Sequence, residues 1–168
     1  SHSEAPATVV LLHGASSSSA DPMLAFGSLL ILVVAGVDKI YSWTSPYSFT
    51  AKIVSLIVIF LGYALASWAL IENRFFSGVV RIQTDRDHYV VTTGPYRFIR
   101  HPGYAGPLWS YLAMPLLLDS NWAFIPAVFL AVVLVVRTSL EDRTLQAELP
   151  GYKEFTQKTR YRLFPGIW

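Results

Sequence analysis

The stretch Ala51-Lys-Ile-Val-Ser-Leu-Ile-Val-Ile-Phe-Leu-Gly-Tyr-Ala-Leu-Ala-Ser-Trp-Ala-Leu-Ile71 decides the fold class of this chain. It holds a single charged residue, Lys52, next to its beginning. A bilayer core about 30 Å thick requires about 20 consecutive apolar residues in a helix. The stretch therefore predicts a transmembrane helix.

The composition of the whole chain agrees with a membrane protein. Of its 168 residues, 53% are hydrophobic and 14% are charged, whereas a typical soluble domain carries roughly 25% charged residues. The high apolar content and a net charge of only +2 exclude intrinsic disorder of the whole chain and give no reason to expect a nucleic-acid partner. Because there is no cysteine, disulfides and thiol nucleophiles are excluded.

Three further stretches are candidates for spans: Met23–Trp43, Tyr104–Leu118 and Trp122–Leu140. The last two are separated by a short polar turn, which predicts an antiparallel helical hairpin. The expected fold class is thus all-α: a multi-span integral membrane protein with about four transmembrane helices, the last two forming a hairpin, and a cytoplasmic C-terminal helical tail.

Basic residues are concentrated in two parts of the chain. Apart from Lys39 and Lys52, every lysine and arginine lies between the second and third spans or from Arg137 onward. Four spans bring both parts to the same side, and the positive-inside rule makes that side cytoplasmic. Residues 1–22 are polar, without a basic residue, and we expect a disordered or non-native extension ahead of a membrane domain at 23–168.

Polar residues that could take part in binding or catalysis gather at the cytoplasmic ends of the predicted spans. His101-Pro102 precedes an apolar run, and proline suits the first turn of a helix. The open N–H groups of such a helix start, together with Arg100, favour an anion. Arg137 and Glu141 are four residues apart, so they share one helix face. They form either a functional pair or a surface salt bridge, with Arg137 extending to the lipid headgroups.

One longer pattern resembles a known family. The string Gly94-Pro-Tyr-Arg-Phe-Ile-Arg-His-Pro-Gly-Tyr104 is followed by the predicted hairpin, by Arg137 and Glu141-Asp142-x-x-Leu145, and by the tail Gly151-Tyr152…Pro165-Gly. This order resembles the isoprenylcysteine carboxyl methyltransferase family, and is similar to its bacterial branch and to phospholipid methyltransferases. The resemblance covers about residues 72–168.

The resemblance implies S-adenosylmethionine as the cofactor and assigns roles to individual residues. Arg137 would contact the substrate, and Arg137 and Glu141 would be catalytic. Asp142 stands where the family usually has a second glutamate, and its role stays open. The implied cofactor-binding residues are Gln83, His88, Tyr89, Val90, Val91, Tyr96, Arg100, His101, Pro102, Gly103, Tyr104 and Glu141.

The chemistry of the cofactor suits these residue types. Its carboxylate suits Arg100, His101 and helix N–H groups, and its ammonium or ribose hydroxyls suit Glu141. Its adenine suits the aromatic faces of Tyr96, Tyr104 or Tyr89. Without the pattern, the same tyrosines also fit an aromatic belt at the membrane surface.

The predicted function is S-adenosylmethionine-dependent methyl transfer to a lipophilic or membrane-embedded acceptor, for example the carboxylate of an isoprenylcysteine. The partners would be a lipophilic small molecule or lipid-modified acceptor and membrane lipid, and the oligomeric state stays open. The alternatives are an NADPH-dependent reductase of the sterol-reductase type, because its R-H-P-x-Y segment is similar, and a non-enzymatic membrane scaffold. The histidines lack the spacing of metal ligands, so no metal site is expected.

Overall fold

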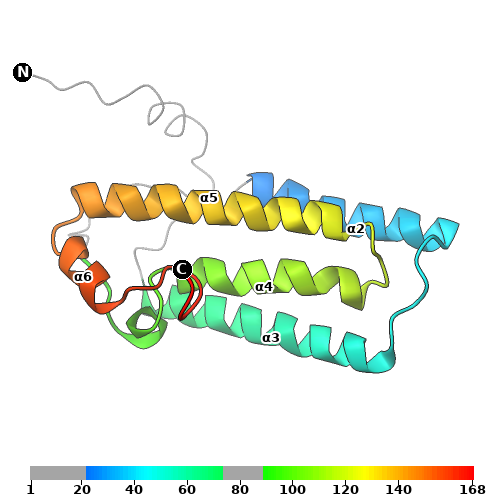
Figure 1. Ribbon diagram of the computed structural model, residues 1–168, viewed down its shortest axis with the longest axis horizontal. Coiled ribbons are helices and arrows are strands. Elements are labelled where there is room, and N and C mark those ends of the chain that lie inside the picture. Colours follow the sequence, from blue (N-terminus) through cyan, green and yellow to red (C-terminus); the bar gives the residue numbers. More distant parts are fainter. Residues whose placement is uncertain (1–21, 74–88) are drawn as a thin grey trace, which may run out of the picture.

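The computed structural model describes residues 22–73 and 89–168, and within these ranges the chain is helical and has no strand. Two positions predicted to bind the cofactor, Gln83 and His88, lie outside the described residues, as does nearly all of the extension 1–22. The long helices run side by side along the molecule (Figure 1): α2 (Pro22–Tyr41), α3 (Phe49–Glu72), α4 (Pro102–Leu117) and α5 (Phe124–Glu148).

Three of these helices, α2, α3 and α5, are long and apolar enough to cross a membrane. Less than a third of each apolar window is buried inside the protein, and large apolar side chains such as Phe60 and Phe129 are exposed. In water such a surface would be strongly unfavourable, so these faces fit a lipid environment. The remaining predicted span, Tyr104–Leu118, corresponds to α4, which has 16 residues. At 1.5 Å per residue it is about 24 Å long, shorter than the bilayer core.

Helix α5 continues beyond the predicted span. The apolar stretch ends at Leu140, whereas the helix ends at Glu148. A helix does not require apolar residues to continue, because its backbone hydrogen bonds are internal. The added turns carry Glu141 and Asp142 past the apolar region into the polar end of the molecule.

Helices α3 and α4 approach each other through two glycines. A Cβ at Gly106 would lie 2.1 Å from the carbonyl oxygen of Gly62, and a Cβ at Gly62 would lie 2.4 Å from the hydroxyl of Ser110 and 2.6 Å from the carbonyl oxygen of Gly106. Small residues at such a crossing allow close backbone packing in a membrane, where lipid gives little hydrophobic drive for helix association. α4 thereby lies between α3 and α5, and α2 packs against α5 (Figure 1).

The end of the molecule that holds the α4–α5 turn is fixed by two aspartates. Asp38 is buried, and its carboxylate accepts hydrogen bonds from Thr44 N–H (2.9 Å), Thr44 Oγ1 (2.7 Å) and Ser120 Oγ (2.6 Å). Asp119, in the turn, pairs with Lys52 Nζ at 2.5 Å. The hydrogen bond from Lys52 is the main reason that the pKa of Asp119 lies below its usual range. These contacts join α2, α3 and the α4–α5 turn.

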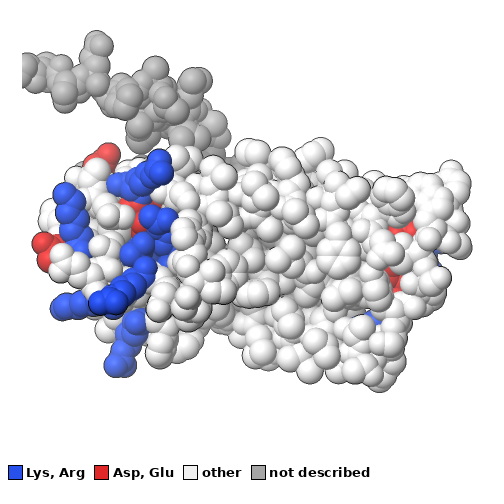
Figure 2. All heavy atoms as spheres, in the orientation of Figure 1, with Lys and Arg blue, Asp and Glu red and all other residues white. Residues whose placement is uncertain are grey.

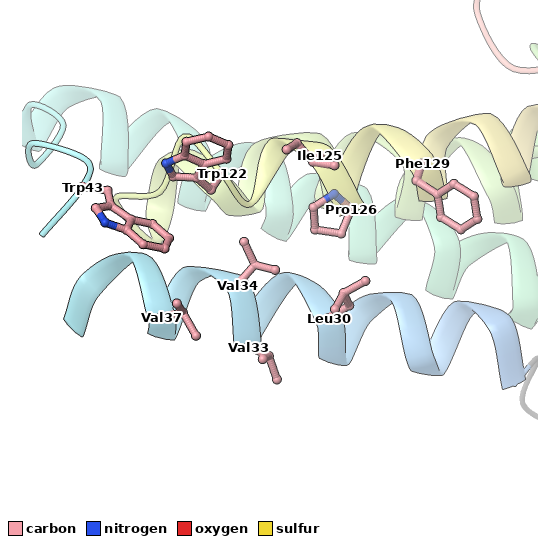
Figure 3. A pocket seen from close by; sticks show the side chains of 9 residues that line it. All are labelled: Leu30, Val33, Val34, Val37, Trp43, Trp122, Ile125, Pro126 and Phe129. Atoms are coloured by element: carbon pink, nitrogen blue, oxygen red, sulfur yellow. The ribbon is translucent and has the colours of Figure 1, made fainter. Parts of the chain in front are cut away.

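A groove of about 470 Å³ runs between α2 and α5 (Figure 3). Its position is given by Trp43 and Trp122, whose rings pack edge to face at 6.0 Å, close to the polar contacts of Asp38 and Ser120. It therefore belongs to the half of the molecule away from α6. Its lining is apolar: Leu30, Val33, Val34, Val37, Trp43, Trp122, Ile125, Pro126 and Phe129.

The opposite end of the molecule carries most of the visible charge. Figure 2 shows lysine and arginine side chains gathered over the end where α6 (Tyr152–Lys158) lies, while the middle of the molecule is almost free of charge on this face. A short 3-10 helix, η2 (Gly94–Arg97), lies at the same end (Figure 1). The expected helical tail is helical only in α6, since residues 159–168 form turns in which the Trp168 carbonyl oxygen accepts three backbone hydrogen bonds.

Candidate functional site

The first feature of the polar end, in sequence order, is a tight turn at Gly94. Gly94 has a φ of +56°, which disfavours any side chain, and a Cβ there would lie 2.9 Å from the Glu72 side chain. The turn directs η2 against the end of α3, where the Tyr96 hydroxyl donates to the Ala69 carbonyl (3.4 Å) and accepts from Asn73 Nδ2 (3.3 Å). Burial raises the pKa of Tyr96 to about 12, so its hydroxyl stays protonated at neutral pH.

The start of α4 is bound to the C-terminal segment by its backbone. The N–H groups of Arg100 and His101 donate to the carbonyl oxygens of Tyr161 and Arg162, both at 2.9 Å. Pro102 follows at the first position of α4, where it has no backbone N–H that would need an acceptor. These two N–H groups precede α4, and within its first turn the Tyr104 N–H donates to the His101 carbonyl oxygen at 3.1 Å.

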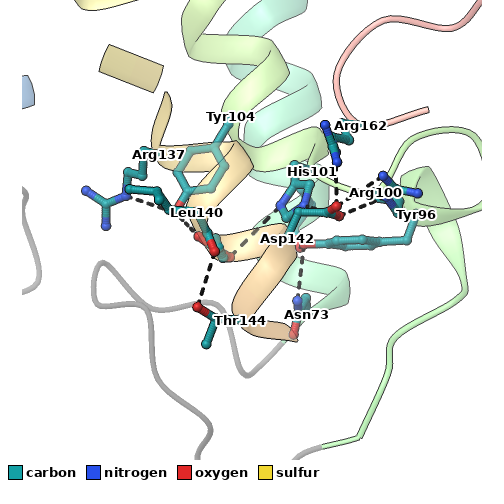
Figure 4. A network of polar contacts seen from close by, with 12 residues as sticks. Asn73, Tyr96, Arg100, His101, Tyr104, Arg137, Leu140, Asp142, Thr144 and Arg162 are labelled. Carbon is teal, nitrogen blue, oxygen red and sulfur yellow. Dashed lines mark hydrogen bonds and ion pairs between the residues drawn. The ribbon is translucent and has the colours of Figure 1, made fainter. Parts of the chain in front are cut away.

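Asp142 is the centre of a buried polar network (Figure 4). Its side chain has no exposed surface. Oδ1 forms an ion pair with Arg100 Nε (2.9 Å), and Oδ2 accepts from Arg162 Nε (2.9 Å) and Arg100 Nη2 (3.2 Å). Three further side chains contact the same carboxylate: His101 through Nε2 (3.2 Å), Tyr152 through its hydroxyl (3.1 Å) and Gln146 through Nε2 (2.7 Å).

This network explains a residue whose role the sequence left open. A buried carboxylate is tolerated when its oxygens are paired and hydrogen-bonded, as they are here. Arg100, Tyr152 and Arg162 are far from Asp142 in sequence, so no local spacing pointed to them. Gln146, four residues along the same helix, was the one local signal. Burial of the Tyr152 hydroxyl raises the pKa of Tyr152 well above its ordinary value, and the neighbouring Asp142 carboxylate raises it further.

Glu141 begins a second and more open layer of the site. The Tyr104 hydroxyl donates to Glu141 Oε2 at 2.7 Å and accepts from Arg137 Nε at 3.3 Å. The Arg137 guanidinium carbon also lies 5.7 Å from the centre of the Tyr104 ring. His101 Nδ1 lies 4.0 Å from Glu141 Oε1, beyond hydrogen-bond distance. The Glu141 side chain is 20% exposed, whereas that of His101 is 3% exposed.

Helix geometry separates these two layers. Successive residues of an α-helix point about 100° apart, so the neighbours Glu141 and Asp142 face different surroundings, while Arg137 shares the face of Glu141. Arg137 and Glu141 meet at one buried hydroxyl, that of Tyr104, which an ordinary surface salt bridge would not require. The pair is therefore joined through the Tyr104 hydroxyl.

The other predicted residues fall into separate surroundings. Tyr96, Val90 and Val91 belong to an apolar cluster with the α6 residues Tyr152 and Phe155. Pro102 and Gly103 are buried at the start of α4, whereas Tyr89 is about half exposed. In the part of the chain that the structure describes, no group of three or more histidine, aspartate or glutamate side chains is arranged to hold a metal ion.

Comparison with known families identifies the architecture. The model of the isoprenylcysteine carboxyl methyltransferase (ICMT) family matches residues 53–147, more than half of the chain. The chain belongs to the ICMT family. The match extends from α3 to the end of α5 and includes the whole Glu141–Tyr104–Arg137 arrangement.

Relatives with established names are similar over part of their length. The chain is 37% identical over 54 residues to a probable protein-S-isoprenylcysteine O-methyltransferase of Oryza sativa subsp. japonica, covering 32% of this chain and 28% of that protein. It is 30% identical over 115 residues to protein-S-isoprenylcysteine O-methyltransferase B of Arabidopsis thaliana, covering 60% and 55%. With the Saccharomyces cerevisiae enzyme it shares 29% over 91 residues, covering 54% and 38%. The chain thus spans between about a quarter and about half of the length of these relatives.

The fold agrees with a solved member of the family. The structure of the eukaryotic intramembrane Ras methyltransferase ICMT superposes with a TM-score of 0.70 at 18% identity, over 95% of this chain and 60% of that one. At this identity the match shows a shared fold. Together with the three long apolar helices, it makes this ICMT-family chain an integral membrane protein.

Proposed function

We propose that this ICMT-family chain transfers a methyl group from S-adenosylmethionine to the carboxylate of a lipophilic acceptor of the isoprenylcysteine type. The observation that carries the proposal is the polar layer of Arg137, Tyr104 and Glu141, located where the apolar part of α5 gives way to its polar end. The relatives are named as methyltransferases, and nothing among them supports the reductase or scaffold alternatives.

The residues of this layer fit the chemistry of the cofactor. Glu141 offers a partly exposed carboxylate, His101 a ring nitrogen, and Tyr104 a buried aromatic face. The cofactor carries an ammonium group, ribose hydroxyls, an adenine and a sulfonium, for which these are suitable partners. When bound, it supplies an electrophilic methyl group on a sulfonium.

We assign the remaining described residues of the predicted set to supporting parts of the same site. Val90, Val91 and Tyr96 would offer an apolar wall for the adenine, with Tyr89 at its edge. Arg100 is bound to Asp142 and to the Thr159 carbonyl oxygen, so its guanidinium would act indirectly, by holding Asp142 in position. Pro102 and Gly103 would form the backbone floor at the start of α4.

Arg137 is proposed to hold the acceptor. An arginine pairs with a carboxylate through two parallel hydrogen bonds, which fixes the position of the attacking oxygen. A carboxylate is already anionic at neutral pH, so no base is needed to remove a proton. The protein therefore has to align the nucleophile and exclude water, and Tyr104 would orient Arg137 for this purpose.

The location of Arg137 suits an acceptor with an apolar chain. The residues that precede it on α5 are apolar, and one side of the helix there is exposed, including Val132 and Val136. A hydrocarbon chain lying in the bilayer along this surface would bring its polar end to Arg137. We extend the proposal to topology: α4 completes a four-span arrangement in residues 23–168 as a hairpin with α5, and the arginine-rich end faces the cytoplasm.

The test is methyl transfer by the full chain in nanodiscs, with labelled S-adenosylmethionine and an N-acetylated isoprenylcysteine as the acceptor. The methyl ester of the same acceptor is the control, since it offers no free carboxylate. We expect Arg137→Gln to lower kcat/KM on the order of 100-fold, a loss typical of a charged hydrogen-bonding group. Arg143→Gln, an exposed arginine of the same helix, should leave it unchanged. Transfer to the ester at the same rate, or equal activity of the two variants, would overturn the proposal.

A further inference from the structure

Residues 162–168, which we call the C-terminal turn, pair most of their backbone N–H groups among themselves. The Trp168 carbonyl oxygen accepts three backbone hydrogen bonds from this segment and the Phe164 carbonyl oxygen accepts two, at 2.9–3.2 Å. Pro165 has no N–H that would need an acceptor. Non-helical backbone can lie at membrane depth only where its polar groups are satisfied within the protein. The hydrogen bonds of the C-terminal turn meet this condition for its donors.

The C-terminal turn lies level with the apolar parts of α4 and α5. Leu163 is buried in one cluster with Leu134 of α5, and the Phe164 ring packs edge to face on that of Trp109 at 5.3 Å. At 1.5 Å per residue, Trp109 is about 10 Å beyond the first residue of α4, and Leu134 is about 9 Å before the end of the apolar stretch at Leu140. The side chains of the turn therefore reach into the apolar region, whereas α6 lies at the outer end of the molecule (Figure 1).

One side of the C-terminal turn is apolar and uncovered. Ile167 is 84% exposed, although it adjoins a region whose other exposed apolar side chains face lipid. Trp168 is partly exposed, and Trp109, beside the turn on α4, is about half exposed. Tryptophans at the edge of an apolar region are typical of the boundary between membrane and water. The exposed side of the turn is thus continuous with the lipid-facing surface.

Basic side chains border the same turn. Arg160 is exposed, and the Arg162 guanidinium lies 4.9 Å from the centre of the Trp168 ring while its Nε pairs with Asp142. Lipid phosphates complement such arginines. A second copy of the chain, packed symmetrically on this turn, would instead bring equal charges together. The charges therefore favour a phospholipid surface over another copy of the chain.

We propose that the C-terminal turn is inserted into the membrane, at the boundary between the phospholipid headgroups and their acyl chains. Ile167 contacts the acyl chains there, and Arg160 contacts the phosphate groups. Because Arg162 joins the turn to Asp142, the insertion holds the buried polar network at the depth of the headgroups. This membrane contact is independent of the reaction that the site performs.

The depth of the turn can be measured with single spin labels, because the chain has no cysteine of its own. Ile167→Cys carries the label in the full chain, in nanodiscs of phosphatidylcholine and phosphatidylglycerol. Phe60→Cys, exposed on α3, is the lipid reference, and Lys153→Cys, exposed on α6, is the water reference. Electron paramagnetic resonance compares the access of oxygen, which concentrates among acyl chains, with that of a neutral water-soluble nickel complex. Circular dichroism checks that each labelled chain is folded.

We expect nickel access at Ile167→Cys to be on the order of 10-fold lower than at Lys153→Cys, because a polar complex is excluded from hydrocarbon. Oxygen access should be close to that at Phe60→Cys. Equal nickel access at Ile167→Cys and Lys153→Cys would place the turn in water and overturn the proposal. Low access of both reagents would mean that protein, such as a second copy of the chain, covers the turn, and this would overturn it as well.

The phosphate contact is tested by adding Arg160→Gln to the labelled Ile167→Cys chain. Exchanging nanodiscs of phosphatidylcholine alone for those with phosphatidylglycerol should lower nickel access about twofold when Arg160 is present, because anionic headgroups attract it. Arg160→Gln should abolish this response, whereas Arg143→Gln, at an exposed arginine of α5, should retain it. The same response in all three chains would overturn the contact between Arg160 and the phosphates.

Discussion

The crossing of α3 and α4 gives a quantitative prediction for Gly106→Ala. The new Cβ would lie 2.1 Å from the Gly62 carbonyl oxygen and 3.2 Å from the Ala66 backbone nitrogen. Both neighbours are backbone atoms of another helix, so no side chain can rotate away. An ordinary contact of about 3.3 Å would require the helices to separate locally by about 1.2 Å.

Such overpacking costs about 1–3 kcal/mol, and rigid backbone neighbours place Gly106→Ala near the upper end. Replacing glycine by alanine within a helix returns about 1 kcal/mol, so the net destabilisation should be about 2 kcal/mol. Gly36→Ala is the matched control, because a Cβ at that helical position meets nothing within 4 Å. It should be neutral or stabilise the protein by up to about 1 kcal/mol.

The assay is reversible unfolding of the purified chain in mixed micelles, followed by circular dichroism and by tryptophan fluorescence, with both glycine variants compared with the parent. If Gly106→Ala were as stable as Gly36→Ala, the close crossing of α3 and α4 would be wrong.

Three other predictions concern polar contacts. Asp142→Asn leaves the buried Arg100 and the partly exposed Arg162 without their counter-charge and should destabilise the fold by about 3 kcal/mol, whereas Asp142→Glu should lose less; chemical denaturation of the variants checks this, and equal losses would contradict it. Because Lys52 lowers the pKa of Asp119 in the folded protein, the pair stabilises the fold above the ordinary carboxyl value of about 3.9 and this stabilisation disappears as the pH falls through the lower, folded value. Stability measured from pH 6 to pH 2 should therefore fall less steeply in Lys52→Met than in the parent, and identical slopes would exclude the pair as a contributor. Tyr104→Phe should reduce kcat/KM for methyl transfer on the order of 10-fold, since one hydroxyl orients both of its charged neighbours; Tyr41→Phe, at an exposed ring of α2, should have no effect, and a parental rate for Tyr104→Phe would remove the hydroxyl from the site.

The helices were predictable to the extent that hydrophobicity determines them. α3 agrees with the stretch 51–71 to within two residues at its start and one at its end, because a continuous apolar run admits few alternatives. The end of α5 was predicted eight residues too early, since its polar part up to Glu148 has no hydrophobic signal. The apolar run of α4 was recognisable, but its 16 residues are fewer than the about 20 that an ordinary span requires.

The sequence identified residues of the candidate site that lie together in the structure, but it did not predict their contacts. His101, Tyr104, Arg137 and Glu141 were all identified from motif and spacing, and the structure brings them together. The role of Asp142 depends on contacts with segments that are distant in sequence, and such contacts leave no local pattern. The same applies to the backbone pairing of Arg100 and His101 with Tyr161 and Arg162, which are distant in sequence.

The adjacency of Glu141 and Asp142 on α5 constrains how this protein family can change in length. A residue inserted or deleted between Arg137 and Asp142 would rotate everything beyond it by about 100° around the helix axis. Either Arg137 would leave the Tyr104 hydroxyl, or Glu141 or Asp142 would leave its own partners. Insertions and deletions between Arg137 and Asp142 are therefore incompatible with the site. Any member of the family that keeps both layers must keep this spacing.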